Sequence, residues 1–88
     1  MNKAMTFTVT DSESGGKPVV WAQTASSAYK DVQELAEGLI RAWADQNLEP
    51  RDRDRIKPEI EDLAYAMRKE GYAWFRERWC FELTEIFG

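Results

Sequence analysis

The sequence predicts an α+β domain, a two-layer sandwich in which two helices cover one face of an antiparallel sheet. Stretches near both ends of the chain alternate apolar and polar residues with the period of two that is typical of β-strands, and the middle repeats apolar residues at helical spacing. The expected order is β-β-α-α-β, with three or four strands in the sheet. Because 88 residues can build only one core, residues 1–88 are expected to form a single domain.

The first two predicted strands form a β-hairpin. Residues 5–11 (MTFTVTD) alternate Thr with apolar residues, and residues 18–24 (PVVWAQT) are rich in β-branched and aromatic residues. SESGGK between them supplies turn-forming residues, including two glycines that can adopt positive φ. The second strand is apolar on both sides. The interpretation that turns Val20 and Ala22 toward the helices and Trp21 outward could therefore be inverted.

The longest predicted helix begins near Ser26 or Ser27, whose hydroxyl would cap its N-terminus, and ends at Asn47, a residue that tolerates the left-handed terminator conformation. Its apolar residues fall on one helical face: Ala28, Val32, Leu35, Ala36, Leu39 and Trp43. Gly38 inside this helix costs about 1 kcal/mol relative to Ala. Its presence indicates either close packing at that point or mere tolerance.

A charged connector, LEPRDRDRIK, is expected before the second helix. That helix would begin with Pro58 at its first position and could stop at Gly71. Its predicted buried residues are Ile60, Leu63, Ala64 and Met67. Trp74 and Phe75 continue the same helical face, so residues 72–78 could be helix, strand or loop.

The final strand, residues 79–86, alternates again. Trp79, Phe81 and Leu83 are expected to point toward the helices, and Cys80, Glu82, Thr84 and Ile86 to point outward.

No motif in the sequence indicates catalysis or metal binding. Histidine is absent, and the single cysteine, Cys80, therefore cannot form a Cys-His nucleophilic pair. Asp52 and Asp54 have the spacing of an oxygen-ligand loop, but the arginines interleaved with them would repel a cation. We expect a protein that is not an enzyme and that holds no cofactor and no metal.

The charge balance of the chain indicates a protein partner more than a nucleic acid. Its net charge is −4, from 16 acidic and 12 basic residues, whereas phosphate binding needs clustered Lys and Arg. No apolar stretch approaches the ~20 residues of a membrane span, and the first ten residues lack the apolar run of a signal peptide. A cytoplasmic location in a bacterial host cell is expected.

Two helices can cover only one face of the predicted sheet, which leaves the other face open. The period of two places hydroxyl, apolar and charged residues on it: Thr6, Thr8, Thr10, Val19, Trp21, Gln23, Cys80, Glu82, Thr84 and Ile86. An aromatic residue among polar groups is typical of a protein contact. The residues predicted to bind a partner are Trp21, Trp79, Cys80, Glu82 and Thr84, with Asp31 and Glu34 as an acidic rim.

The hairpin, the long helix, the second helix and the closing strand with its cysteine together resemble a family of small phage anti-CRISPR proteins. VWAQTASSAYKDVQEL resembles that family's passage from strand into helix. The resemblance implies binding to the HNH nuclease domain of a type II CRISPR effector. The family's closing strand carries a Ser-Cys-Trp-Glu-Phe type of segment whose Ser-Cys portion meets the catalytic groups. Residues 79–83 correspond to it, with Trp79 in place of the serine, so only Cys80 and Glu82 carry over.

These observations lead to one functional hypothesis and two alternatives. The hypothesis is a non-enzymatic, protein-binding inhibitor of the phage type, anti-CRISPR-like, whose partner is a CRISPR effector or another nucleic-acid-binding protein. The first alternative is a structural domain that forms a homodimer through the same sheet face. The second is an acidic mimic of DNA, which would bind its partner through charges on the helices.

Overall fold

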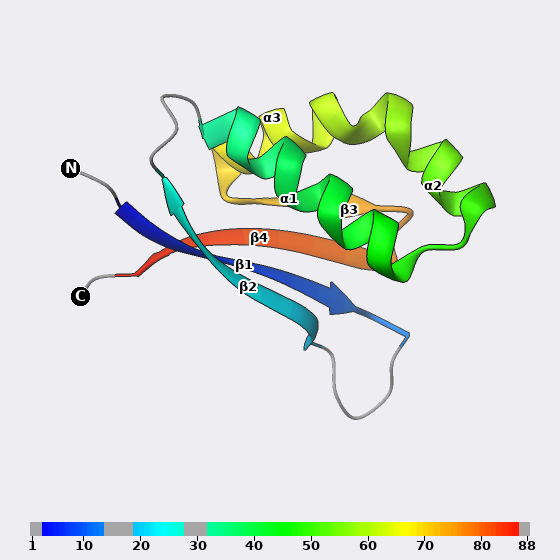
Figure 1. The fold of residues 1–88 in the computed structure, drawn as a ribbon, viewed down its shortest axis with the longest axis horizontal. Helices are drawn as coiled ribbons and strands as arrows, with labels where there is room; N and C mark the ends of the chain where they lie inside the picture. The colour runs from blue at the N-terminus through cyan, green and yellow to red at the C-terminus, as the bar shows by residue number, and fades with distance from the viewer. Residues whose placement is uncertain (1–2, 14–18, 28–31, 87–88) are drawn as a thin grey trace.

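The computed structural model describes residues 3–13, 19–27 and 32–86, which form a four-stranded antiparallel sheet with its helices on one side (Figure 1). The elements are β1 Lys3–Asp11, β2 Val19–Ser27, α1 Val32–Asn47, α2 Pro50–Ile56, a 3₁₀ turn Lys57–Glu59, α3 Ile60–Glu70, β3 Tyr72–Phe75 and β4 Trp79–Ile86. The strands lie in the order β2-β1-β4-β3. The predicted α+β class is confirmed, whereas the observed order contains an extra short helix and a fourth strand.

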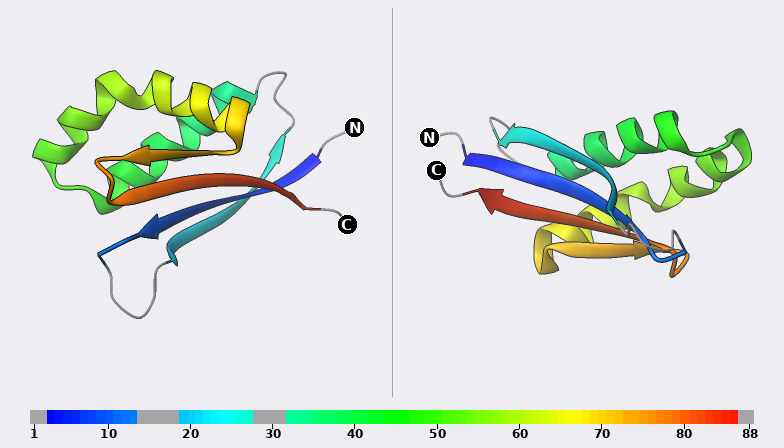
Figure 2. Two further views of the ribbon diagram at one scale, coloured as in Figure 1. Left: turned by 180° about the vertical axis from the view of Figure 1, so that it is seen from behind. Right: turned by 90° about the horizontal axis from the view of Figure 1, so that it is seen from below.

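The core lies between the sheet and the two longer helices, α1 and α3, which cover the same face in every view (Figure 2). The alternation predicted for β1 and β4 is confirmed, because Phe7 and Phe81 are both fully buried and stack with ring centroids 6.0 Å apart. Trp43 of α1 packs edge-on against Phe81 at 5.1 Å and against Trp79 at 5.7 Å. One aromatic cluster therefore joins the longest helix to the two central strands.

Strand β2 presents the face opposite to the one first assigned. Trp21 lies opposite Val9 in the register, and its ring meets Phe7 edge-on at 5.6 Å. Ala22 lies opposite Thr8 and is exposed. The assignment that turned Trp21 outward is therefore wrong. Both sides of this strand are apolar, and a register shift after Val9 further interrupts the period-two pattern.

Helix α1 confirms its predicted apolar face and its predicted end at Asn47, but not its predicted N-cap. Leu35, Ala36, Leu39 and Trp43 are buried, and Val32 packs at the edge of the core. The expected N-cap is wrong, because the cap serines are still part of β2 and pair with β1. Ala28 and Asp31 lie outside the described residues.

The C-terminus of α1 and the glycine within it have local explanations. Asn47 does not adopt the left-handed conformation, which occurs among the described residues at Gly71, Arg76 and Glu77. Its side-chain amide instead donates a hydrogen bond to the carbonyl of Trp43 at 3.0 Å. A Cβ built on Gly38 meets no atom within 4 Å. The helix therefore tolerates a glycine at this position, and no close packing requires one.

The expected charged connector is largely helical. Pro50 stands at the start of α2, and Asp52 in the first turn and Arg55 in the last complement the helix dipole. Ile56 at its end is 1% exposed and anchors it to the core. Pro58 then lies in the 3₁₀ turn that precedes α3, so it is not the first residue of that helix. Burial of Ile56 and the position of Pro50 at the helix start therefore favour a helix here, although most residues of the segment are charged.

After α3 the chain forms a strand, which was one of the three interpretations of residues 72–78. Gly71 ends the helix with φ at 87°, and its N–H donates to the carbonyl of Met67 at 2.8 Å. A tight turn then connects β3 to β4. Arg76 and Glu77 both have φ at 56°, and the i→i+3 hydrogen bond of this turn measures 3.2 Å. These are the features of a type I′ turn, whose twist suits a hairpin.

Candidate functional site on the open face of the sheet

The face of the sheet that points away from α1 and α3 is called the outer face below. Its described side chains come from all four strands: Thr6, Thr8, Thr10, Ala22, Thr24, Tyr72, Trp74, Cys80, Glu82 and Thr84. The side chains of Val19, Gln23 and Ile86, which the sequence also predicts there, lie outside the described part of the structure. The register arranges the described set in rows across the strands, so their mutual positions are fixed by backbone pairing.

The large aromatic groups of the outer face come from β3, not from β2. Trp74 is 49% exposed and Tyr72 is 46% exposed, whereas Ala73 and Phe75 between and after them are buried. The sequence prediction missed both aromatics because it left residues 72–78 undecided. The available signal was the aromatic, strand-favouring composition of YAWF directly after a glycine that can end a helix.

Cys80 lies in the row between Trp74 of β3 and Thr10 of β1. Although its face carries no helix, it is only 6% exposed, and its row neighbours therefore cover it. Burial raises the pKa of the Cys80 thiol, and the nearby charge of Glu82 raises it further. The thiol therefore stays protonated at neutral pH and is a poor nucleophile.

Glu82 is the only charged side chain among the described residues of the outer face. It lies between Tyr72 and Thr8 in its row and is exposed. Thr84 lies two positions further along β4, opposite Thr6, and is also exposed. The outer face therefore has two aromatic rings at one edge, a carboxylate beside them and several threonine hydroxyl groups on the central strands.

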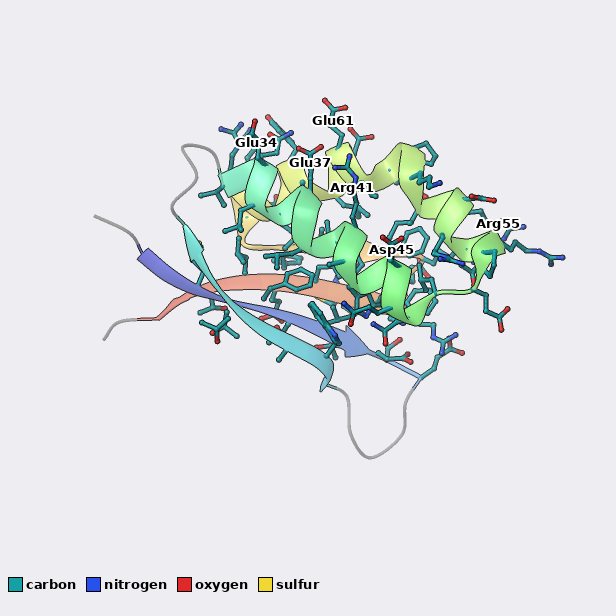
Figure 3. All side chains as sticks on the ribbon, in the orientation of Figure 1. Glu34, Glu37, Arg41, Asp45, Arg55 and Glu61 are labelled. Carbon is teal, nitrogen blue, oxygen red and sulfur yellow. The ribbon has the colours of Figure 1, made fainter. Side chains whose placement is uncertain are left out.

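Three other residues predicted to bind a partner, Trp21, Trp79 and Glu34, do not lie on the outer face, and Asp31 lies outside the described residues. Trp79 is 9% exposed within the core, and Trp21 packs beneath the helices. Glu34 is exposed at the start of α1, on the helix side of the sheet (Figure 3). An acidic rim around the outer face is therefore not formed by Glu34. Of the predicted residues that the structure describes, Cys80, Glu82 and Thr84 alone share the outer face.

An ionic cluster fixes the end of the sheet where β1 and β4 meet. Arg78 donates two hydrogen bonds to Asp11, from Nε to Oδ1 at 3.0 Å and from Nη2 to Oδ2 at 3.1 Å, and its Nε lies 3.1 Å from Glu13 Oε2. The hydrogen bond from Arg78 lowers the pKa of Asp11, helped by the backbone N–H of Glu13. The guanidinium also lies 4.5 Å above the ring of Trp79. This cluster is structural, because each of its groups already has a partner.

The charges along α1 alternate in sign, and α3 carries basic groups in its last turn. Glu37, Arg41 and Asp45 succeed one another at intervals of four residues along α1 (Figure 3). On α3, Arg68 and Lys69 stack on the ring of Tyr65 at 5.3 and 5.4 Å. The described residues of α1 therefore do not form the continuous acidic face that a DNA mimic would need.

Comparison of the chain with protein-family models, with curated protein sequences and with solved structures found no match. Within the described part of the chain, none of the helices has both the length and the apolar character needed to cross a membrane.

Proposed function

We propose that this chain is a non-enzymatic, protein-binding inhibitor of the mobile-element type, anti-CRISPR-like, that covers a functional surface of a nucleic-acid-processing effector with its outer face. One observation carries the proposal. Trp74 and Tyr72 are half exposed beside Glu82 on a sheet face that no described helix covers. Large exposed aromatics next to hydroxyl and charged groups are typical of the centre of a protein interface.

The rigidity of this surface favours binding. The aromatic side chains stand on a strand paired along its length with β4, and they lose few rotational states when a partner covers them. The threonine hydroxyls of β1 can each donate and accept a hydrogen bond. Such a surface offers an apolar anchor at one edge and polar groups that can satisfy a partner's backbone or side chains.

The anti-CRISPR form of the proposal rests on the resemblance of residues 79–83 to a segment that meets the catalytic groups of an HNH nuclease. Cys80 is buried, so a partner would reach it only if the neighbouring side chains of the outer face, Trp74 among them, moved aside. Glu82 is exposed and therefore is the group of this segment that can meet the partner directly. A carboxylate there could pair with the basic groups that a nuclease uses to hold DNA.

The test uses purified type II CRISPR nuclease loaded with guide RNA, in a DNA-cleavage assay and a direct binding measurement. Wild-type protein should inhibit cleavage, and the double variant Trp74→Ala/Glu82→Lys should lose inhibition while retaining its folded circular-dichroism spectrum. The matched control, Glu34→Lys on the helix side, should inhibit like the wild type. Absence of inhibition by the wild type, or full inhibition by the double variant, would overturn the proposal.

The same experiments separate the two alternatives. Inhibition that fails with Glu34→Lys and disappears at moderate salt would indicate a DNA mimic acting through the helices. A stable dimer in sedimentation, abolished by Trp74→Ala, together with no effect on the nuclease, would indicate a homodimeric structural domain.

A further inference from the structure

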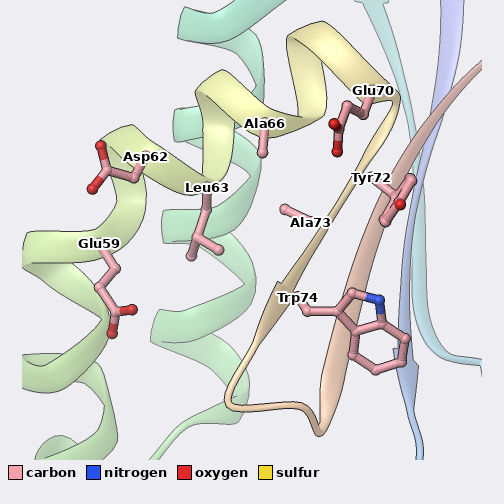
Figure 4. A pocket seen from close by; sticks show the side chains of 8 residues that line it. All are labelled: Glu59, Asp62, Leu63, Ala66, Glu70, Tyr72, Ala73 and Trp74. Carbon is pink, nitrogen blue, oxygen red and sulfur yellow. The ribbon is translucent and has the colours of Figure 1, made fainter.

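A groove opens between α3 and the last strand of the sheet, β3. It has a volume of about 270 Å³, and its floor is apolar, formed by Leu63 and Ala66 of the helix (Figure 4). Three carboxylates stand along it: Glu59, Asp62 and Glu70. On the other side of the groove lies β3, whose Ala73 points toward the helix, whereas the side chains of Tyr72 and Trp74, which also border the groove, point away from it. The groove is therefore apolar at its base and acidic along its helical wall.

The acidic wall has no internal counter-charge. Glu59, Asp62 and Glu70 follow one another at spacings that keep them on one side of the helix. In the part of the chain that the structure describes, none of the three forms an ion pair. Of the basic residues nearest in sequence, Lys57 pairs with Asp54, and Arg68 and Lys69 stack on Tyr65. None of the three lines the groove. An unneutralised row of carboxylates favours a cationic ligand.

The backbone of β3 adds hydrogen-bonding groups at the same place. The strand ends the order β2-β1-β4-β3, so one of its edges is free. Leu83 N–H donates to the carbonyl of Gly71 at 3.0 Å, and in an antiparallel ladder bonded pairs alternate with unbonded ones. Ala73 lies two residues after Gly71, so its backbone groups also bond to β4. The backbone groups of Tyr72 and Trp74, on either side of Ala73, therefore point to the free edge.

A free strand edge can pair with an extended peptide, which adds to the sheet as a further strand. Eleven residues separate the first and last carboxylates of the groove, which corresponds to about 16 Å along a helix at ~1.5 Å per residue. A strand of about five residues has the same length at ~3.3 Å per residue. Every second side chain of the added peptide strand would face the carboxylates of the groove. The side chains between them would lie beside the exposed aromatic rings of β3.

We propose that the free edge of β3 binds an extended, basic peptide segment of a partner protein, with Lys or Arg at alternate positions facing Glu59, Asp62 and Glu70. This inference rests on the proposed function, because it specifies how a protein partner engages the strand that carries Tyr72 and Trp74. Main-chain pairing provides the orientation, and the carboxylates select for positive charge. An arginine on the other side of the added strand would stack on the Trp74 indole.

The direct test is titration of ¹⁵N-labelled full chain with a capped six-residue peptide that alternates Arg and Val. Resonances of β3 and α3 should shift, and a peptide with Glu in place of Arg should bind at least tenfold more weakly. The charge-reversal variant Asp62→Lys/Glu70→Lys should also weaken binding at least tenfold, whereas Glu61→Lys, exposed on the same helix but outside the groove, should change it by less than threefold. Equal binding by the groove variant and the wild type would overturn the proposal.

A second pair of variants tests the strand pairing itself. Trp74→Pro removes a backbone donor that points to the free edge, and the extended residue before it tolerates a following proline. Trp74→Val removes the same indole but keeps the N–H. Binding should therefore be weaker by at least fivefold in Trp74→Pro than in Trp74→Val. Equal binding by the two folded variants would refute strand addition. Resonance shifts confined to β2, the opposite edge strand, would also refute it. So would pairing of two copies of the chain through β3 with no response to the peptide.

Failure of this inference can be told apart from failure of the proposed function. Thr84→Arg changes the outer face at a residue that does not line the groove, so it should impair nuclease inhibition and leave peptide binding intact. If inhibition depends on the outer face but the peptide does not bind, the edge proposal is wrong and the proposed function stands. If the peptide binds but the nuclease is never inhibited, the proposed function is wrong.

Discussion

Substitution of Trp43 by Phe tests the energetics of the core. Trp43 is 1% exposed and touches two further aromatic rings, yet its ring nitrogen Nε1 has no hydrogen-bond partner among the described residues. A buried donor without a partner costs about 1–3 kcal/mol. Phe would keep the edge-on contacts and remove the unpaired donor.

The expected change in the free energy of unfolding follows from three contributions. Phe lacks two ring carbons of the indole, a loss of roughly 1.5 kcal/mol at ~0.8 kcal/mol per buried carbon. A residual cavity of about 40 Å³ adds about 1 kcal/mol at ~24 cal/mol per Å³. Relief of the unpaired N–H offsets about 1–3 kcal/mol of this. Trp43→Phe should therefore change stability by only about −1.5 to +0.5 kcal/mol, whereas Trp43→Ala should lose about 3–5 kcal/mol.

The measurement is urea unfolding at 25 °C followed by far-UV circular dichroism, with equal m-values as the check for two-state behaviour. Phe81→Leu is the matched control, because it removes apolar volume beside Trp43 without releasing a polar group, and it should lose about 1–3 kcal/mol. A loss of about 3 kcal/mol or more for Trp43→Phe would refute the reasoning, since it would mean that the indole N–H is satisfied in the folded protein.

Three further predictions concern single positions. Gly38→Ala should stabilise the protein by about 0.5–1 kcal/mol in the same urea assay, because a Cβ there meets no atom within 4 Å; a loss of stability would contradict this. Arg78 lowers the pKa of Asp11 in the folded state below the ordinary value of 3.8. The free energy that this ion pair contributes to folding is therefore complete above pH 3.8 and is lost as the pH falls through the pKa of the folded state. The stability difference between wild type and Asp11→Asn should therefore be full at pH 7 and shrink below about pH 3.8; a difference independent of pH would rule this out. Finally, alkylation of Cys80 by iodoacetamide should be slow in the folded protein and several-fold faster in Trp74→Ala, as measured by mass spectrometry, and equal rates would show that the indole does not cover the thiol.

The sequence determined the parts of this protein whose pattern is local and unambiguous. The alternation through Phe7 and Phe81 required strands with one buried face, and the apolar stripe that includes Leu39 and Trp43 required a helix packed on that face. These predictions succeeded because the period of two and the period of 3.6 are properties of the backbone, so within a regular strand or helix the sequence spacing decides which side chains share a side. They also located Glu82 and Thr84 on the open face of the sheet.

Tertiary structure decided the segments whose local pattern supports more than one state. Residues 50–56 read as a charged connector, but burial of Ile56 makes them a helix. The strand carrying Trp21 is apolar on both sides, and only its pairing with β1 fixes which side faces the helices. Residues 72–75 could extend a helix until Gly71 ended it and β4 supplied a partner strand. A strand needs a neighbour to satisfy its backbone, and that neighbour is distant in sequence. The exposed aromatic pair of the candidate site, Tyr72 and Trp74, therefore exists only in the folded chain.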